Sequence, residues 1–213
     1  MNPFDLTSLM QRLTGFVRAE GVALELCEDM EALYRHQPEL EGKTLSPLFR
    51  HDLFDMQDAF WIKGTRLFDG KLVHVQASKL EDTGRHTLAA VLPRQLSRCY
   101  DGGAQVAGCP AMEQIRGRLA YHGDTWVSPA MRGKNLGGPL TQIGLLATYA
   151  RWQPDFVYAF FEHGAAFSGF GARSWYTKME RMGRRWNRWL EQTEYLAYMS
   201  RDELDRLVAL EAR

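Results

Sequence analysis

One stretch, residues 126–140, constrains the fold of this chain more than any other: Trp-Val-Ser-Pro-Ala-Met-Arg-Gly-Lys-Asn-Leu-Gly-Gly-Pro-Leu. Strand-forming residues precede it, and an apolar-striped helix follows from Leu136. A chain that turns through glycines into a helix directs several free backbone N–H groups at one point, where the helix dipole adds partial positive charge. Arg132 and Lys134 add full charges. The stretch therefore predicts an anion site, typically for phosphate, between a strand and a helix.

The composition narrows the class of protein. The chain has 213 residues, 45% of them hydrophobic, which suits one domain with a substantial core. Lys and Arg together number 26, as do Asp and Glu, so no global field attracts nucleic acid. We see no apolar run of membrane-spanning length and no signal peptide. The widely spaced Cys27, Cys99 and Cys109 favour a cytoplasmic protein without disulfides, and their spacing predicts no metal site.

Local patterns predict an alternation of helices and strands. Apolar periodicity and capping signals place helices at 4–19, 29–37, 45–56, 136–153, 167–182 and 200–213. Strand-forming runs lie at 22–27, 59–68, 71–80, 118–127, 156–161, 186–189 and 195–199. Asp69-Gly70 is a strong signal for a tight hairpin turn, and the nearly all-apolar run 156–161 is typical of a strand that is buried on both faces.

Residues 81–117 form a long connection between the hairpin and the next strand. Residues 87–100 have a helical pattern that Pro93 is expected to interrupt, and glycine-containing loops follow. A connection of this length is usually functional or disordered, so we expect an insertion or a lid that faces the substrate. A surface insertion without a role is the alternative. We expect residues 1–213 to form a single domain, with an N-terminal helix at 1–20 and a C-terminal helix at 200–213.

Two short motifs resemble those of a known family. The turn Arg132-Gly133-Lys134-Asn135-Leu136-Gly137 is similar to a signature of Arg or Gln, two residues, Gly, one residue, then Gly or Ala. Val127-Ser128-Pro129 is similar to the Val-x-Pro that precedes this signature, and Ala172 and Tyr176 match a downstream Asn-x-x-Ala-x-x-x-Tyr motif. With the order of elements, the chain resembles the GCN5-related N-acetyltransferase (GNAT) superfamily over roughly residues 22–200. The resemblance implies an α/β fold with a mixed, mostly antiparallel central sheet, flanking helices, and strands that splay at the cofactor site.

The sequence departs from the family pattern at three points. Asn135 replaces the first glycine of the signature, although Asn is the residue other than Gly that best tolerates a left-handed backbone. Gly169 stands where the family often has Asn. The spacing from Tyr176 to Gly183 is longer than usual, and no Phe follows.

The resemblance implies acetyl-CoA, or another acyl-CoA, as co-substrate and no metal. Its pyrophosphate would lie on the glycine turn, and its pantetheine arm would lie between the splayed strands like an extra strand. The implied cofactor-binding residues are Trp126, Val127, Arg132, Gly133, Lys134, Asn135, Leu136, Gly137 and Gly138. Without the resemblance, the turn would be interpreted as an ordinary loop with exposed basic residues.

Acetyl transfer needs an amine that has lost its proton, a stabilised oxyanion and a proton for the leaving thiolate. Tyr176 matches the position of the family's common general acid; core packing is its alternative role. For the base, we rank Glu162 first, at the end of the buried strand, and His122 second. His122 and Asp124, two residues apart, are expected to share one face of their strand. Other candidates are His163, His74 and Glu81, and each residue is alternatively a satisfied polar side chain.

We therefore predict an acetyl-CoA-dependent N-acetyltransferase that acts on an amine of a small molecule or a protein. One alternative is a longer-chain acyltransferase that uses acyl-CoA or acyl carrier protein, with residues 81–117 and the many aromatics lining a wider pocket. Another is a non-catalytic CoA-binding or scaffold domain. The basic, Trp-containing run 181–189 offers a surface for nucleic acid or an acidic partner, but the zero net charge favours a solvated strand face. The sequence leaves open whether the chain forms a homodimer.

Overall fold

The computed structural model describes residues 2–100, 105–185 and 191–212. Its helices are α1 (Pro3–Ala19), α2 (Met30–Arg35), α3 (Leu88–Cys99), α4 (Gly137–Trp152), α5 (His163–Phe167), α6 (Phe170–Arg173) and α7 (Arg201–Glu211). Its strands are β1 (Val22–Cys27), β2 (Ala59–Arg66), β3 (Leu72–Thr87), β4 (Gln105–Ala107), β5 (Arg116–Val127), β6 (Phe156–Glu162), β7 (Lys178–Arg185) and β8 (Glu191–Ser200).

The strands form one mixed sheet in the order β1-β2-β3-β5-β6-β8-β7-β4. Neighbouring strands are antiparallel, except that β5 and β6 are parallel. A parallel pair needs a crossover connection, and α4 supplies it. The mostly antiparallel mixed sheet with flanking helices confirms the predicted fold class.

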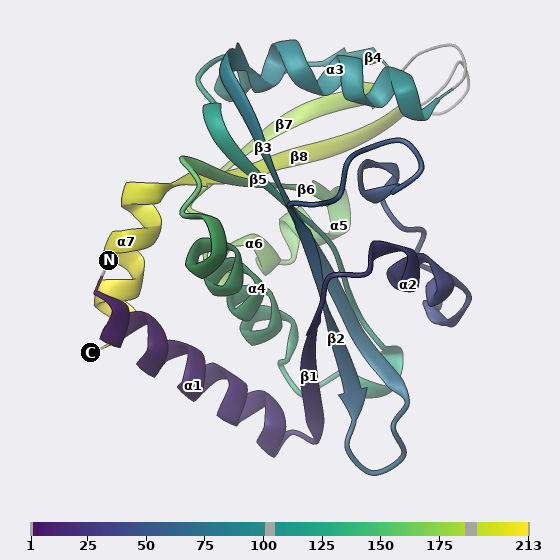
Figure 1. Ribbon diagram of the computed structural model, residues 1–213, viewed down its shortest axis with the longest axis vertical. Helices are drawn as coiled ribbons and strands as arrows, with labels where there is room; N and C mark the ends of the chain where they lie inside the picture. The colour runs from purple at the N-terminus through teal and green to yellow at the C-terminus, as the bar shows by residue number, and fades with distance from the viewer. Residues whose placement is uncertain (1, 101–104, 186–190, 213) are drawn as a thin grey trace.

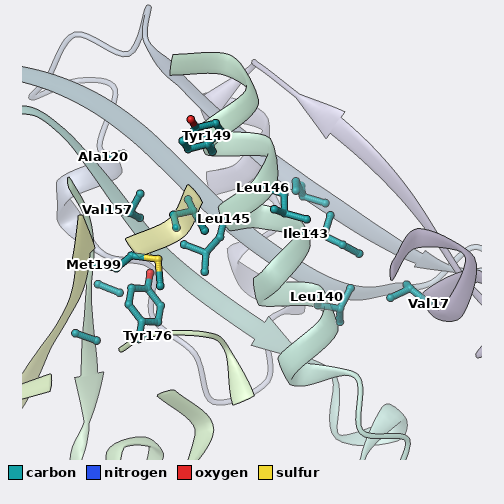
Figure 2. Packing of buried hydrophobic residues seen from close by; sticks show 14 of the residues in the cluster. Val17, Ala120, Leu140, Ile143, Leu145, Leu146, Tyr149, Val157, Tyr176 and Met199 are labelled. Carbon is teal, nitrogen blue, oxygen red and sulfur yellow. The ribbon is translucent and has the colours of Figure 1, made fainter. Parts of the chain in front are cut away.

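Helices cover both faces of the sheet (Figure 1). On one face α1, α4 and α7 contribute to a core that includes Val17, Leu145 and Val208, part of which Figure 2 shows. On the other face α2 and α3 contribute to a second core, which includes Leu33 and Leu92. The sheet is therefore the middle of three layers, as expected when both of its faces are apolar.

The parallel pair β5–β6 separates after a short contact. Only Leu119↔Phe156, Ala120↔Val157 and Tyr121↔Tyr158 pair across it in the described residues. Beyond this point β5 carries one extra residue relative to β3, because Ala77 pairs with Gly123 and Val75 pairs with Trp126. The extra residue forms a bulge in which Asp124 has a φ of 54°, and a bulge bends a strand and increases its twist. The predicted splay between the strands is confirmed.

The hairpin and the terminal helices agree with the sequence prediction. β2 and β3 are antiparallel around the Asp69-Gly70 turn, and Gly70 has a φ of 71°. β3 continues to Thr87, seven residues beyond the expected end at Leu80. At the C-terminus Ser200 caps α7, and Glu203 completes a capping box.

Two helix predictions were wrong. The segment 167–182 contains the end of α5, the short α6 and the start of β7, because Gly169 and Trp175 adopt left-handed backbones that interrupt the helix. Residues 45–56 contain only a single 3-10 turn, Pro47–Phe49. Leu48 and Phe49 are buried there, so their apolar pattern reflects packing rather than a longer helix. The predicted strand 186–189 lies outside the described residues.

The segment 81–117 is built into the sheet and its covering layer. It supplies the end of β3, then α3, β4 and the start of β5. Leu88, Leu92 and Leu96 of α3 are buried, and Pro93 lies inside the helix without ending it. A role for this segment as a lid over a substrate stays a prediction. In the parts of the chain that the structure describes, no helix is both long and apolar enough to cross a membrane.

Gly144 of α4 lies directly against polar side chains of the sheet. A Cβ at this position would lie 2.6 Å from Gln76 Oε1 and 2.7 Å from His122 Nε2. Both side chains are buried, so neither can move into solvent to relieve the contact. The helix therefore packs at this distance only because residue 144 has no side chain.

We expect Gly144→Ala to lower the free energy of unfolding by about 1–3 kcal/mol, the usual cost of overpacking a core. Gly15 in α1 is a matched control, because a Cβ there would meet nothing within 4 Å. Gly15→Ala should raise stability by about 0.5–1 kcal/mol through helix propensity. Urea unfolding of both variants provides the test. An equal or greater stability of Gly144→Ala would contradict this packing argument.

Candidate functional site

The glycine turn follows the splayed end of β5. Ser128 caps a 3-10 turn, Pro129–Met131, and α4 then begins at Gly137 with Leu136 as its N-cap. Between them Gly133 has a φ of 83° and Asn135 a φ of 54°. Asn135 therefore adopts the left-handed backbone that the sequence predicted for it, at the position where the family signature has glycine.

A pocket of about 700 Å³ opens on this turn. One wall is the turn and the first residues of α4, and the other is α6 with the residues that follow it. The lining residues are Val127, Met131, Arg132, Gly133, Asn135, Leu136, Gly137, Gly138, Pro139, Gln142, Phe170, Ala172, Arg173, Trp175 and Glu211. They include every predicted cofactor-binding residue except Trp126 and Lys134.

The side chains of Trp126 and Lys134 make other contacts. Lys134 Nζ donates to the backbone carbonyl of Glu20 at 2.9 Å and lies 3.5 Å from the Glu20 carboxylate. It therefore neutralises the C-terminal end of α1, where carbonyl groups lack helical partners. The buried indole of Trp126 donates to the Glu41 carbonyl at 3.4 Å, and the Trp126 carbonyl accepts a hydrogen bond from His74 Nδ1 at 2.7 Å.

Sequence reasoning missed the wall of the pocket that α6 provides. Arg173 Nη1 donates to the Ser168 carbonyl at 2.9 Å, and the Arg173 carbonyl accepts from Gln142 Nε2 at 2.8 Å. A Cβ at Gly138 would lie 2.9 Å from the Arg173 carbonyl oxygen, so a glycine is needed where α4 meets α6. The sequence predicted one continuous helix over 167–182. It therefore gave no sign that the short α6 brings Arg173 back to the turn.

The charges of the pocket suit an anion. Arg132 and Arg173 contribute two guanidinium groups, and the first N–H groups of α4 add the positive end of the helix dipole. Glu211, at the end of α7, is the one acidic residue in this lining. Backbone N–H groups around left-handed residues, together with arginines, are the groups that bind pyrophosphate in proteins. The residues present therefore fit a nucleotide-type cofactor.

Tyr176 and His122 are brought together under α4. Tyr176 leaves the end of α6, packs its ring edge-on against Phe161 of β6, and places its hydroxyl 3.1 Å from His122 Nδ1 of β5. It therefore bridges the two splayed strands. Figure 2 shows Tyr176 inside the core formed with Leu145, with its hydroxyl turned into that core.

The hydrogen bonds around His122 define where its proton lies. Gln76 Nε2 donates to the Leu140 carbonyl at 2.7 Å, so Gln76 Oε1 faces His122 Nε2 at 3.1 Å. An amide oxygen accepts, and His122 Nε2 must therefore carry the proton. His122 Nδ1 is left as an acceptor, and Tyr176 donates its hydroxyl hydrogen to it. Both nitrogens of His122 are used in this buried network.

Burial keeps this network neutral. Desolvation lowers the pKa of His122 to about 3, with a smaller contribution from His74, and lowers the pKa of His74 to about 4. Desolvation also raises the pKa of the Tyr176 phenol well above its usual value. His122 therefore stays uncharged, and Tyr176 keeps its proton, throughout the physiological pH range.

Asp124 does not share a face with His122, which corrects the expectation for a regular strand. The bulge turns its side chain to the opposite side of the sheet, where both carboxylate oxygens accept the Ser46 N–H, at 2.9 and 3.0 Å. Lys43 Nζ lies 3.4 Å from Asp124 Oδ1. Burial raises the pKa of Asp124, although Lys43 and the Ser46 N–H act in the other direction.

The other predicted base candidates are spread around the sheet. Glu162 is exposed at the end of β6, on the strand that leaves β5. His163 Nδ1 lies 3.4 Å from the Tyr195 hydroxyl, and Glu81 accepts a hydrogen bond from Gln95. No group of three or more His, Cys, Asp or Glu side chains suited to a metal ion occurs among the described residues.

The two buried histidines predict a pH dependence of stability. Their folded pKa values lie below the ordinary value near 6.5, so the unfolded chain binds protons that the folded chain does not. Stability is then fully present above about pH 6.5 and is lost as the pH falls toward 4. Between pH 6.5 and 5 we expect unfolding in urea to take up as many as two protons. Each proton lowers the free energy of unfolding by about 1.4 kcal/mol per pH unit as the pH falls.

The exposed His86 is the control for this measurement. His86→Gln is the matched substitution at a histidine that lies outside the buried network. A free energy of unfolding that stays constant from pH 6.5 to 5 would rule out neutral, buried His74 and His122.

Comparison with known proteins bears on the fold. No family model and no curated protein matches the sequence. Among solved structures, Arabidopsis thaliana NAA60 in complex with acetyl-CoA matches at a TM-score of 0.51 and 14% identity, over 84% of this chain and 99% of that chain. A point mutant of the spermidine N-acetyltransferase SpeG from Vibrio cholerae matches at a TM-score of 0.52 and 8% identity, over 88% of this chain and 98% of that chain. The chain therefore has the fold of the GNAT acetyltransferases.

Proposed function

We propose that this chain is an N-acyltransferase that transfers an acetyl group from acetyl-CoA to an amine. The observation that carries the proposal is the position of the pocket. It lies where the splayed end of β5 meets the N-terminus of α4, and it contains the left-handed Asn135 and two arginines. An anion site beside a gap between two strands suits a ligand with a phosphate end and a long, narrow arm.

Each part of the site would bind a different part of this ligand. The N–H groups of the turn and of the first residues of α4 would hold the pyrophosphate, together with Arg132 and Arg173. Beyond Tyr121 the edge of β5 has no partner strand on its β6 side in the described residues, so the arm would lie along this edge. Bound acetyl-CoA would supply the acetyl thioester.

Two carboxylates flank the splay and are candidates to accept the proton of the amine. Glu162 lies at the end of β6, and Asp124 lies on the bulge of β5. His122 is less suited to this role, because both of its nitrogens are used and its pKa is about 3. Glu162 and Asp124 are therefore the candidates that we propose for the general base.

Tyr176 stays the candidate donor of a proton to the leaving thiolate. Its hydroxyl bridges the splayed strands, and burial keeps it protonated. To act, the phenol must turn its hydrogen away from His122 Nδ1. The hydrogen bond to His122 thus holds the hydroxyl in place and also opposes its use as an acid.

We expect calorimetry to detect binding of acetyl-CoA to the purified chain. Arg173→Ala should weaken binding about tenfold or more, because a charge-assisted hydrogen bond contributes about 1.5–3 kcal/mol. Lys134→Ala is the matched control. It removes a neighbouring positive charge that contacts Glu20 instead of the pocket, so we expect a change of less than about twofold.

The outcomes separate the hypotheses for the donor. Binding of longer-chain acyl-CoA or acyl carrier protein, without binding of acetyl-CoA, would replace this proposal by the longer-chain alternative. No binding of any acyl donor would refute an acyltransferase. Equal losses from Arg173→Ala and Lys134→Ala would show that net charge, rather than the wall formed by α6, determines affinity.

Turnover tests Tyr176. Thiol release from acetyl-CoA can be followed with spermidine and with peptides that have free N-termini as probe acceptors, since such amines suit an N-acetyltransferase. We expect Tyr176→Phe to lower turnover with little change in the affinity for acetyl-CoA. It should also cost about 1–3 kcal/mol of stability, because His122 Nδ1 loses its donor. Unchanged turnover in a folded variant would remove Tyr176 from the mechanism.

A further inference from the structure

An internal amine lies against the splayed part of β5. Lys43, in the segment between α2 and β2, places its Nζ 3.4 Å from Asp124 Oδ1. The Lys43 side chain is 30% exposed, whereas that of Asp124 is only 1% exposed. The Ser46 N–H, which donates to both Asp124 oxygens, holds the same segment in place. The structure thus presents a partly accessible primary amine on a buried carboxylate.

The position of this pair relates it to the proposed cofactor site. Asp124 lies on β5 between Tyr121, where β5 leaves β6, and Val127, which lines the pocket. Three residues of extended strand span about 10 Å. An arm that starts at the glycine turn and lies along the free edge of β5 therefore passes the bulge. The bulge turns Asp124, and Lys43 with it, to the face of the sheet opposite α4.

The chemistry of the pair suits acyl transfer to Lys43. A lysine amine is nucleophilic only after it has lost a proton, and the adjacent carboxylate is the nearest acceptor. Desolvation raises the pKa of Asp124, which makes it a better proton acceptor than an exposed carboxylate. Lys43 is the charged group that acts on Asp124, and the neighbouring Tyr34 hydroxyl donates to the Ser46 carbonyl.

We propose that Lys43 is a self-acetylation site and that its amine occupies the position of an acceptor amine beside Asp124. The inference rests on the proposed function, because the acetyl group must come from acetyl-CoA bound at the glycine turn. It also assigns the class of acceptor: a primary amine that arrives as an ammonium ion and pairs with the Asp124 carboxylate.

The Lys43 ammonium gives one proton to Asp124, and its nitrogen attacks the thioester carbon. The C–N bond forms, the C–S bond breaks, and the second proton of the nitrogen ends on the departing sulfur as a thiol. The products are an uncharged acetyl-lysine, CoA, and a proton that Asp124 passes to solvent. Asp124 then keeps its Ser46 hydrogen bond but loses its ion-pair partner.

Mass spectrometry of the full chain tests this proposal. The protein is incubated with acetyl-CoA and no added amine, and acetylation is mapped by peptide. Lys71 is the internal control, because it is exposed and reports on chemical acetylation. We expect Lys43 to be acetylated at least tenfold faster than Lys71 with acetyl-CoA, and excess CoA to suppress only the Lys43 reaction. Acetyl phosphate, a donor that lacks the CoA moiety, should remove the preference.

Two variants complete the test. Lys43→Arg should abolish the fast acetylation at position 43. Asp124→Asn, whose side-chain oxygen still accepts the Ser46 N–H, should slow acetylation of Lys43 at least tenfold. Equal rates at Lys43 and Lys71 in the unmodified chain would overturn the proposal, whether or not the variants fold. Calorimetry on the same sample distinguishes a failure of self-acetylation from a failure of the proposed function. Binding of acetyl-CoA without a fast Lys43 reaction refutes only self-acetylation, whereas absence of binding refutes the proposed function as well.

Discussion

The separation of β5 from β6 is the constraint on which the rest of this structure depends. Two parallel strands that pair over three residues and then diverge lack strand pairing on their inner edges beyond Tyr121 and Tyr158 in the described residues. An ordinary sheet would pair the backbone groups of these edges, since unpaired backbone inside a protein is costly. Here the bulge at Asp124 turns β5 away, and the glycine turn at its end leads into α4. The gap and the pocket thus both lie next to one irregularity in the strand.

The splay also explains why the core beneath α4 is polar at one point. An apolar core would fill the divergence with aliphatic side chains, whereas this chain bridges it with Tyr176 and His122, which Gln76 orients. Gly144 provides the space that this network needs. Burying polar groups costs free energy unless they are hydrogen-bonded, as these are. The network therefore fixes the distance between the strands on one face, while the opposite face carries the Asp124 carboxylate.

Much of this arrangement was predictable because it depends on local chemistry. The glycine turn, the left-handed Asn135 and the hairpin at Asp69-Gly70 follow from backbone preferences of single residues. The fold class followed from the family resemblance, which rests on the turn motif together with the order of such elements. The helix predicted over 167–182 failed because left-handed residues, which the apolar pattern does not reveal, divide it. The strand prediction failed to anticipate the opposite faces of His122 and Asp124, because a bulge shifts the alternation without any sequence signal.

By itself, the sequence determined the strand–turn–helix unit, since residue types and their spacing decide where a helix begins and where backbone N–H groups are left free. Only the tertiary structure decided which side chains complete the site. It directs Lys134 to α1 and brings Arg173 to the pocket from a short helix. It also places Lys43 against Asp124 across the sheet. These contacts join residues far apart in the chain, and their geometry depends on how strands twist and separate, which no local pattern encodes.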